Sequence, residues 1–278
     1  MDKATLFICP TPIGNLKDVT LRVLETLKSV DLIAAEDTRQ TVKLLNHYDI
    51  KNKLISYHEH NKMKMQPVLI NELKDGKNIA LVTDAGMPGI SDPGSDIVLA
   101  CIKENINVEV LPGANAAITA LVASGLSTES FLFIGFLPKK ITEAKRLLEN
   151  IKNETHTLIF YESPHRLIKI LELLNEVLGD RDISIARELT KIHEQFLRLK
   201  ITGAIDHFKG TDPRGEFVLV VEGAKKDTLK PPADESTIQQ TVFAYKEQGL
   251  STKDAIIKAA QELGLSRNIV YKSAKASK

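Results

Sequence analysis

The chain has 278 residues, of which 43% are hydrophobic and 26% charged, and its formal net charge is +1 at pH 7. This composition is typical of a globular protein of about two domains and excludes a fibrous or low-complexity chain. The longest apolar runs, such as LFIC and VDLIAA, are far shorter than the ~20 residues that span a bilayer. The N-terminus also lacks the apolar segment of a signal peptide, so we expect a cytoplasmic protein without membrane contact.

Charge and cysteine content exclude further classes. The nearly balanced charge does not by itself indicate a nucleic-acid partner, because proteins that bind the phosphate backbone usually carry a basic excess. Cys9 and Cys101 are the only cysteines, and neither belongs to a C-x-x-C pair. We expect buried, reduced thiols, with a disulfide as the alternative.

Up to about residue 113, short apolar runs alternate with amphipathic segments. The apolar runs are TLFICPTPIGN, VDLIAAEDTR, KLISYHEHN, NIALVTDAG and NVEVLPGAN. The segments between them place apolar residues at three-to-four spacing, as in DVTLRVLETLKS, TRQTVKLLNHY, KMQPVLINELKDG and SDIVLACIKEN. This alternation predicts a parallel sheet covered by helices, with ligands bound at the carboxyl ends of the strands.

A helix of small residues, ANAAITALVASGL, precedes a second series of elements. The strand candidates are FLFIGFLP, TLIFYES, DISIARELT, EQFLRLKIT and EFVLVVEGA, and helices are expected near residues 142–152 and 164–178. Some of these strands follow each other closely, which predicts antiparallel pairs in a mixed sheet. The fold class is therefore α/β, with a parallel sheet in residues 1–115 and a mixed sheet in residues 116–226.

The last part of the chain is helical. A charged, proline-bearing linker, AKKDTLKPPADEST, is followed by the helix patterns TIQQTVFAYKEQG, STKDAIIKAAQELG and SRNIVYKSAKA. The second and third have the spacing of a helix-turn-helix, and residues 231–278 form a small C-terminal domain. With seven Lys/Arg against five Asp/Glu, this domain is either a packing or dimerising cap or a nucleic-acid reader.

The loop LVTDAGMPGISDPGSD, residues 81–96, lies at the end of a predicted strand. Its G-x-x-x-x-G spacing matches a phosphate-binding loop, but the next two residues are Ser95 and Asp96 instead of Lys and Ser or Thr. Three aspartates without a cation are a poor phosphate site. Together with the LPGANAA turn, the loop favours a nucleoside-like ligand that presents hydroxyls and amines. The alternative is that both segments bind nothing and are only tight connections between strands and helices.

Six segments in order resemble the tetrapyrrole methylase superfamily: TPIGNLKDVTLR, AAEDTR, LVTDAGMPGISDPG, LPGANAAITALVASGL, FYESPHR and ARELTKIHE. Within it, they are similar to the RsmI branch of bacterial 16S rRNA (cytidine-2′-O)-methyltransferases. The resemblance covers residues 5–224, and the helical tail is similar to the C-terminal domain of that branch. It implies S-adenosylmethionine as cofactor, held in a cleft between two α/β domains, a homodimer, and 16S rRNA of the small ribosomal subunit, in its decoding region, as substrate.

The resemblance also implies a set of cofactor-binding residues. They come from the first strand end, the loop after the fourth strand, the PGAN turn and the second domain: Pro12, Asp84, Gly86, Met87, Asn115, Ala116, Tyr161 and Ala186. No metal is expected for this chemistry. His58 and His60 share a strand face, but no third ligand is spaced to complete a metal site.

Methylation of a ribose hydroxyl needs a group that accepts its proton. Glu36, Asp37 and Arg39 are the first candidates for the catalytic group, ahead of the other acceptor candidates Glu162, Glu188 and Glu194. The alternative role for Asp37 is structural: it would cap the helix TRQTVKLLNHY and pair with Arg39.

Four cations are expected to contact RNA phosphates, namely Arg39, Arg166, Arg187 and Lys191. An internal salt bridge with Glu162 or Glu188 is the alternative for Arg187. The basic segment PKKITEAKRLLENIK is either an RNA contact or a solvated helix face.

Two alternative functions are considered. One is methylation of a small tetrapyrrole or related metabolite with the same cofactor and fold. The other is a helix-turn-helix binding protein with a degenerate enzyme body, against which the intact cofactor motifs argue.

Overall fold

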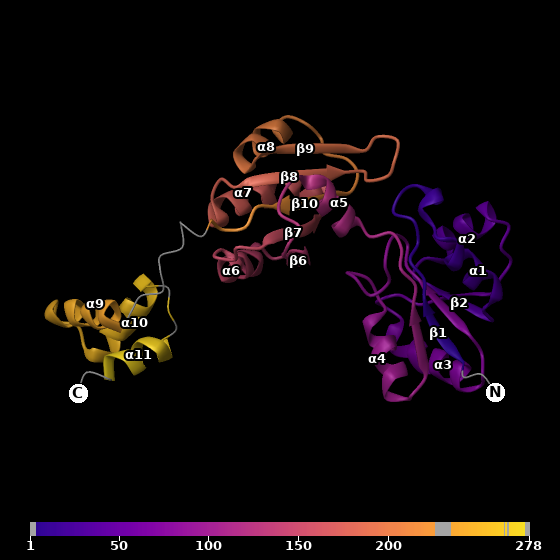
Figure 1. Cartoon of the computed structure of the whole chain (residues 1–278), viewed down its shortest axis with the longest axis horizontal. Helices are drawn as coiled ribbons and strands as arrows, with labels where there is room; N and C mark the ends of the chain where they lie inside the picture. The colour runs from indigo at the N-terminus through magenta and orange to yellow at the C-terminus, as the bar shows by residue number, and fades with distance from the viewer. Residues whose placement is uncertain (1–3, 226–234, 264, 266, 276–278) are drawn as a thin grey trace. The chain divides into compact units, whose positions relative to one another are not determined.

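The structure, a computed structural model, describes residues 4–225, 235–263, 265 and 267–275. The chain divides into two compact units, Met1–Ala224 and Lys225–Lys278. The first contains two five-stranded sheets and the second contains helices (Figure 1). Most of the predicted proline-bearing linker and both ends of the predicted C-terminal domain lie outside the described residues.

The first sheet is entirely parallel, as the alternation of strands and helices predicts. Its strand order is β3-β2-β4-β1-β5. The strands are β1 (Thr5–Ile8), β2 (Leu32–Ala35), β3 (Leu54–Ser56), β4 (Ile79–Val82) and β5 (Asn107–Val110). All four residues of β4 are buried, which explains its continuous apolar run.

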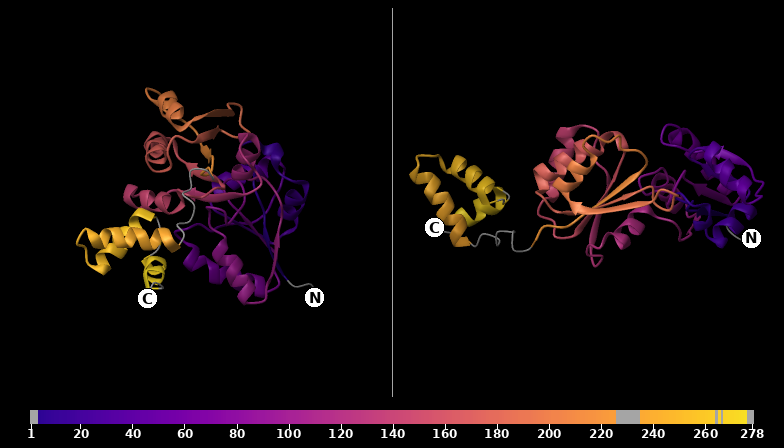
Figure 2. Two further views of the ribbon diagram at one scale, coloured as in Figure 1. Left: turned by 60° about the vertical axis from the view of Figure 1, so that its left-hand side comes forward. Right: turned by 90° about the horizontal axis from the view of Figure 1, so that it is seen from above.

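Helices cover both faces of the first sheet (Figure 2). α1 (Leu21–Ser29) and α2 (Thr38–His47) pack on one face. α3 (Lys62–Lys74) and α4 (Ser95–Lys103) pack on the other. A short 3-10 helix, η1 (Leu16–Asp18), follows β1. In such a doubly covered sheet, the loops at the carboxyl ends of the strands are the part left to bind a ligand.

The second sheet is mixed, which confirms the prediction. Its order is β6-β7-β10-β8-β9; β6 and β7 are parallel, and the other neighbours are antiparallel. The strands are β6 (Phe131–Phe136), β7 (Thr157–Glu162), β8 (Asp182–Arg187), β9 (Gln195–Lys200) and β10 (Phe217–Val221).

The two faces of the second sheet are covered differently. Among the described helices, α5 (Ala116–Ser124) is the one that packs on one face. The opposite face carries α6 (Ile141–Ile151), α7 (Leu167–Leu178), which follows the 3-10 helix η2 (Pro164–Arg166), and α8 (Ile201–Phe208). The sequence prediction missed α8, because EQFLRLKIT was taken as a single strand. The chain instead turns into a helix after Lys200, and the four buried side chains of this helix have helical spacing: Ile201, Ala204, Ile205 and Phe208.

The C-terminal unit has the expected helices α9 (Glu235–Glu247), α10 (Thr252–Leu263) and α11 (Arg267–Lys275). They enclose a small core of their own, built mainly of alanine, valine and isoleucine side chains. No helix in the described part of the chain is both long and apolar enough to cross a membrane.

Candidate active site

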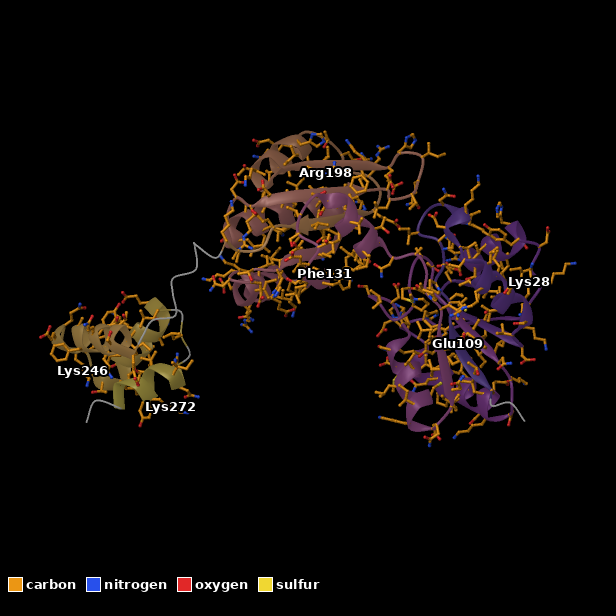
Figure 3. The ribbon with its side chains drawn as sticks, in the orientation of Figure 1. Lys28, Glu109, Phe131, Arg198, Lys246 and Lys272 are labelled. Carbon is orange, nitrogen blue, oxygen red and sulfur yellow. The ribbon has the colours of Figure 1, made fainter. Side chains whose placement is uncertain are left out.

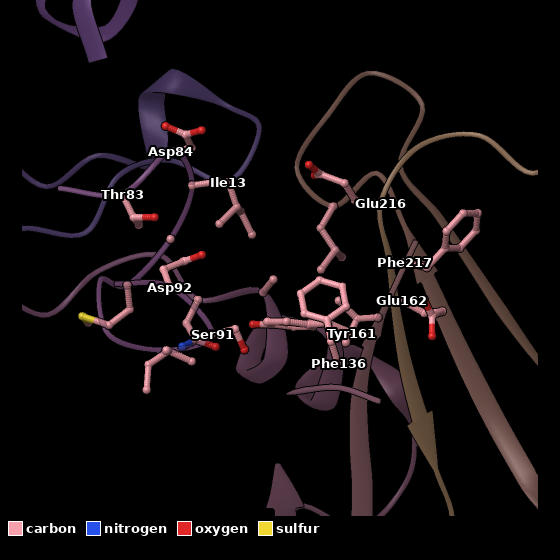
Figure 4. A pocket seen from close by; sticks show the side chains of 18 of the residues that line it. Ile13, Thr83, Asp84, Ser91, Asp92, Phe136, Tyr161, Glu162, Glu216 and Phe217 are labelled. Carbon is pink, nitrogen blue, oxygen red and sulfur yellow. The ribbon is translucent and has the colours of Figure 1, made fainter. Parts of the chain in front are cut away.

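A cavity of about 400 Å³ lies within the first unit, between the loops of the first sheet and one end of the second sheet (Figure 4). One wall comes from the loop after β4 and the other from β6, β7 and β10. Among the described residues that line the cavity, none is a lysine or arginine, and five are carboxylates: Glu36, Asp84, Asp92, Glu162 and Glu216. The cavity therefore suits a neutral or cationic ligand and disfavours phosphate.

Backbone contacts hold the loop after β4 in place. Thr11 and Gly86 exchange two backbone hydrogen bonds, with N–O distances of 2.9 and 3.0 Å. The Thr11 hydroxyl donates a further bond of 2.9 Å to the carbonyl of Thr83. Gly86 has a φ of +86°, which favours glycine at this turn. Pro12 lies beside this bridge but does not line the cavity.

Three carboxylates converge at the end of β4. The Thr83 hydroxyl donates to Glu36 Oε2 at 2.5 Å, and the Asp84 N–H donates to the same oxygen at 3.3 Å. Burial, reinforced by the charge of Glu36, raises the pKa of Asp92 to about 6. The same two causes raise the pKa of Asp84. Such mutual repulsion is relieved by a bound cation.

Asp37 and Arg39 have a local structural role at the start of α2. The Asp37 carboxylate caps α2 by accepting the N–H of Arg39 at 2.9 Å, and its Oδ2 lies 2.6 Å from Arg39 Nη2. Hydrogen bonds from Arg39 lower the pKa of Asp37 to about 2. The capping alternative is thus confirmed, and neither residue lines the cavity. A carboxylate that binds a proton so weakly is a poor base. The role of Glu36 as proton acceptor stays a prediction.

The second wall is formed by the start of α5 and by aromatic side chains. Asn115 caps α5 by accepting the N–H of Ile118 at 3.1 Å, and Ala116 follows it in the cavity wall. Tyr161 projects from β7 into the same wall. Ala186, predicted to contact the cofactor, is 1% exposed in the core beneath α5 and does not line the cavity.

Arg166 is predicted from sequence to contact RNA phosphates, but its guanidinium binds groups of the protein itself. Its Nη1 donates to the carbonyl of Leu137 at 3.1 Å and its Nη2 to that of Pro138 at 3.0 Å. Nη2 also lies 3.7 Å from Oε2 of Glu162, whose side chain is 1% exposed. The guanidinium thus anchors the chain after β6, and these contacts favour a structural role over phosphate binding.

The other two predicted phosphate contacts lie near the cavity without lining it. Arg187 Nε donates to the carbonyl of Arg214 at 2.7 Å, so its observed hydrogen bond is to the backbone and not to the expected carboxylate. Lys191 Nζ forms ion pairs of 3.0 Å with Glu188 and with Glu216. Binding of RNA by these cations stays a prediction.

Sequence reasoning missed part of the lining. Asp92 lies in the same loop as Asp84, and a second aspartate in a loop already assigned to a ligand was the available signal. Phe136, Glu216 and Phe217 also line the cavity, but they sit in or beside strands whose apolar patterns only indicate a buried sheet. In the part of the chain that the structure describes, no group of three or more His, Cys, Asp or Glu residues is arranged so that it could hold a metal ion.

The fold and the cavity together define a class of protein. It is a two-sheet α/β protein whose strand-end loops form a carboxylate-rich cavity suited to a nucleoside-like ligand without phosphate. Within that class, the chain belongs to the Tetrapyrrole (Corrin/Porphyrin) Methylases, whose family model matches residues 5–204.

Relatives and solved structures agree with this assignment. The "Ribosomal RNA small subunit methyltransferase I" of Halalkalibacterium halodurans is 51% identical over 97% of this chain and 94% of its own length. That of Bacillus subtilis is 48% identical over the same shares. Uroporphyrin-III-C-methyltransferase from Thermus thermophilus has 18% identity and a TM-score of 0.55, covering 78% of this chain and 94% of its own. Diphthine synthase has 14% identity and a TM-score of 0.63, covering 79% and 90%. These two structures show the shared fold.

Proposed function

We propose that this protein is an S-adenosylmethionine-dependent methyltransferase that methylates small-subunit ribosomal RNA, at the ribose 2′-hydroxyl of a cytidine in the decoding region. The observation that carries the proposal is the identity of 51% and 48% to methyltransferases of that RNA, over 97% of the chain. A uroporphyrin-III methyltransferase and a cobalt precorrin-4 methyltransferase share the fold, but each covers only 78% of the chain. Methylation of a tetrapyrrole therefore has less support.

The cavity fits S-adenosylmethionine, which carries a sulfonium, an ammonium, a carboxylate and a ribose diol but no phosphate. Its volume of about 400 Å³ lies in the range of ligand pockets. Burial and the charge of Glu36 raise the pKa values of Asp84 and Asp92. A bound cation or hydroxyl donor would stabilise the charged forms of these carboxylates. These two residues would hold the ammonium and ribose, while Asn115 and Ala116 at the start of α5 would hold the carboxylate. Gly86 and Met87 complete the wall.

The bound cofactor supplies a methyl group activated by its sulfonium charge. The protein orients the acceptor and receives its proton. Glu36 is the proton acceptor that the geometry favours, because the Thr83 hydroxyl and the Asp84 N–H both donate to Oε2 and hold the carboxylate in one orientation. Holding the acceptor oxygen in line can account for several kcal/mol of the barrier.

The pH dependence of cofactor binding tests the role of Asp92. Its pKa is raised to about 6 without ligand, so the carboxylate is protonated as pH falls through about 6 and attracts a cation less. Affinity for S-adenosylmethionine, measured by calorimetry between pH 5 and 8, should therefore fall toward pH 5. The sign for stability is opposite: the raised pKa stabilises the ligand-free fold at low pH, and this contribution is lost as pH rises through about 6. Asp92→Asn should flatten the binding profile, and an unchanged profile would remove Asp92 from the site.

Transfer of labelled methyl groups by the purified protein tests the function itself. We expect incorporation into unmodified small-subunit rRNA, at ribose positions resistant to alkaline cleavage. A porphyrinogen offered under the same conditions should remain unlabelled. Label in the tetrapyrrole and not in the RNA would overturn the proposal in favour of the metabolite reaction.

A homodimer in the cytoplasm completes the proposal. α4 and the edge strand β5 leave apolar side chains exposed, with Leu99 at 52%, Ile102 at 60% and Val110 at 55%. Exposed apolar groups beside an unpaired strand edge support a contact between copies. Sedimentation equilibrium should give twice the chain mass, and a single-chain mass at micromolar concentration would contradict the dimer. The cytoplasmic location follows from the RNA substrate.

A further inference from the structure

β6 contains a bulge beside the cavity. Along the parallel pair with β7, Phe133 pairs with Ile159, but Gly135 pairs with the next residue, Phe160, so Ile134 is an extra residue. A bulge reverses the alternation of side chains beyond it. Gly135 has a φ of +71°, where the bend favours glycine, and a Cβ there would lie 3.0 Å from the Ser91 hydroxyl.

The bulge brings two phenylalanines to the same face of the second sheet. In a regular strand, Phe133 and Phe136 would point to opposite faces because they are three residues apart. Here both rings contact Tyr161, with centroid distances of 5.1 and 5.6 Å. Ile134 and Leu137 pack instead into the core on the opposite face. The result is that Phe136 lines the cavity next to Tyr161 (Figure 4).

Although Phe136 contacts Tyr161, more than half of its side chain is exposed to solvent. Its exposed fraction is 56%, whereas Phe133 and Tyr161 beside it are half-buried. The chain after it is held by Arg166, which donates to the carbonyls of Leu137 and Pro138. A large apolar ring is thus fixed at the rim of the cavity, with one side against Tyr161 and much of its surface in water.

We propose that Phe136 is the surface on which the base of the target nucleotide stacks while its ribose enters the cavity. The inference rests on the proposed function. The methylated oxygen belongs to the same nucleoside as the base, so the base must lie within one nucleoside length of the point of methyl transfer. The rim of the cavity is such a place, and exposed aromatic rings are the groups on which unpaired RNA bases stack.

The charge near Phe136 is compatible with RNA. Lys139 and Lys140 follow it after two residues and are exposed. They belong to a segment, residues 138–152, with five basic residues against two acidic ones. Phosphates that flank a stacked base would meet this segment, whereas the carboxylates inside the cavity would repel them. The base would therefore be received at the rim and the phosphates outside it.

The test compares Phe136→Ala with a matched variant, Phe131→Ala, in the full-length protein. Phe131 lies on the same strand, is 42% exposed and does not line the cavity (Figure 3). We expect Phe136→Ala to raise KM for unmodified small-subunit rRNA by about tenfold, in the range of a lost base–aromatic stack. Phe136→Trp should keep a KM near that of the wild type. Phe131→Ala should leave KM unchanged.

Three measurements separate this role from others. In Phe136→Ala, the KM for rRNA should rise several-fold more than the Kd for S-adenosylmethionine, because the ring lies at the rim of the cavity. An equal or larger loss of cofactor affinity would make cofactor binding the main role of Phe136 and overturn the inference. Sedimentation should be unchanged, and a change in mass would assign Phe136 to a contact between copies instead. An unchanged KM in an otherwise active enzyme would overturn only this inference, whereas a wild type that methylates no RNA would overturn the proposed function as well.

Discussion

Replacing Asp84 by Asn should weaken binding of S-adenosylmethionine by roughly thirtyfold. The carboxylate lines the cavity, and burial together with the nearby Glu36 raises its pKa, so the apo site holds negative charge that a cationic ligand relieves. A hydrogen bond to a charged group contributes about 2 kcal/mol, which corresponds to the stated loss of affinity. The amide can still accept the N–H of Asp37, which now lies 3.0 Å from Asp84 Oδ1. Calorimetry at pH 7.5 measures the effect.

Asp96→Asn is the matched control for this prediction. Asp96 belongs to the same acidic loop region but lies at the start of α4, where it forms a 2.7 Å ion pair with Lys62 and does not line the cavity. Its replacement should leave cofactor affinity within about twofold, since its ion pair is half-exposed and contributes little. Equal losses in the two variants would show that the net charge of the loop region, and not the position of Asp84, governs binding.

Replacing Arg166 by Met should lower the free energy of unfolding by about 3 kcal/mol. The guanidinium serves two backbone carbonyls and lies 3.7 Å from Glu162, whose side chain is 1% exposed. Without it, the carboxylate remains buried with no compensating cation nearby, which is a costly state. Urea unfolding of the full chain measures the loss. Arg146→Met, at an exposed position on α6, should change stability by less than about 0.5 kcal/mol.

A double variant identifies the cause. If the buried charge of Glu162 produces the loss, Arg166→Met combined with Glu162→Gln should be clearly more stable than the sum of the two single effects. A stable Arg166→Met protein that binds RNA poorly would instead support the phosphate contact expected from sequence. The structure favours the first outcome, because both of the guanidinium's hydrogen bonds are to the chain itself.

The elements of the first sheet could be predicted because its strands are short, apolar and separated by amphipathic helices. α8 was not separated from β9, since EQFLRLKIT continues an apolar pattern across the change at Ile201 and the helical spacing of α8 begins only at that residue. The loop after β4 could be assigned to a ligand site because it combines glycines and carboxylates without a lysine, whereas the choice of Asp84 within it came from the family resemblance. These features involve only a few neighbouring residues, and patterns of that length can be recognised in a sequence.

The rest of the site depends on contacts between distant residues. The bulge at Ile134 decides which face Phe136 occupies, yet FLFIGFLP is uniformly apolar and contains no sign of the change in register apart from Gly135. Arg166, the last residue of FYESPHR, is one of the cations predicted from sequence to contact RNA phosphates. Its actual partners, the carbonyls of Leu137 and Pro138, lie 29 and 28 residues away in sequence.

The most direct test of the proposed function is mass-spectrometric mapping of ribose methylation in 16S rRNA from cells with and without the gene. We expect that one 2′-O-methylated cytidine in the decoding region disappears when the gene is absent. It should return when the wild-type gene is restored, and should not return fully with Asp84→Asn. An identical methylation map in both cells would contradict the assignment of small-subunit rRNA as substrate.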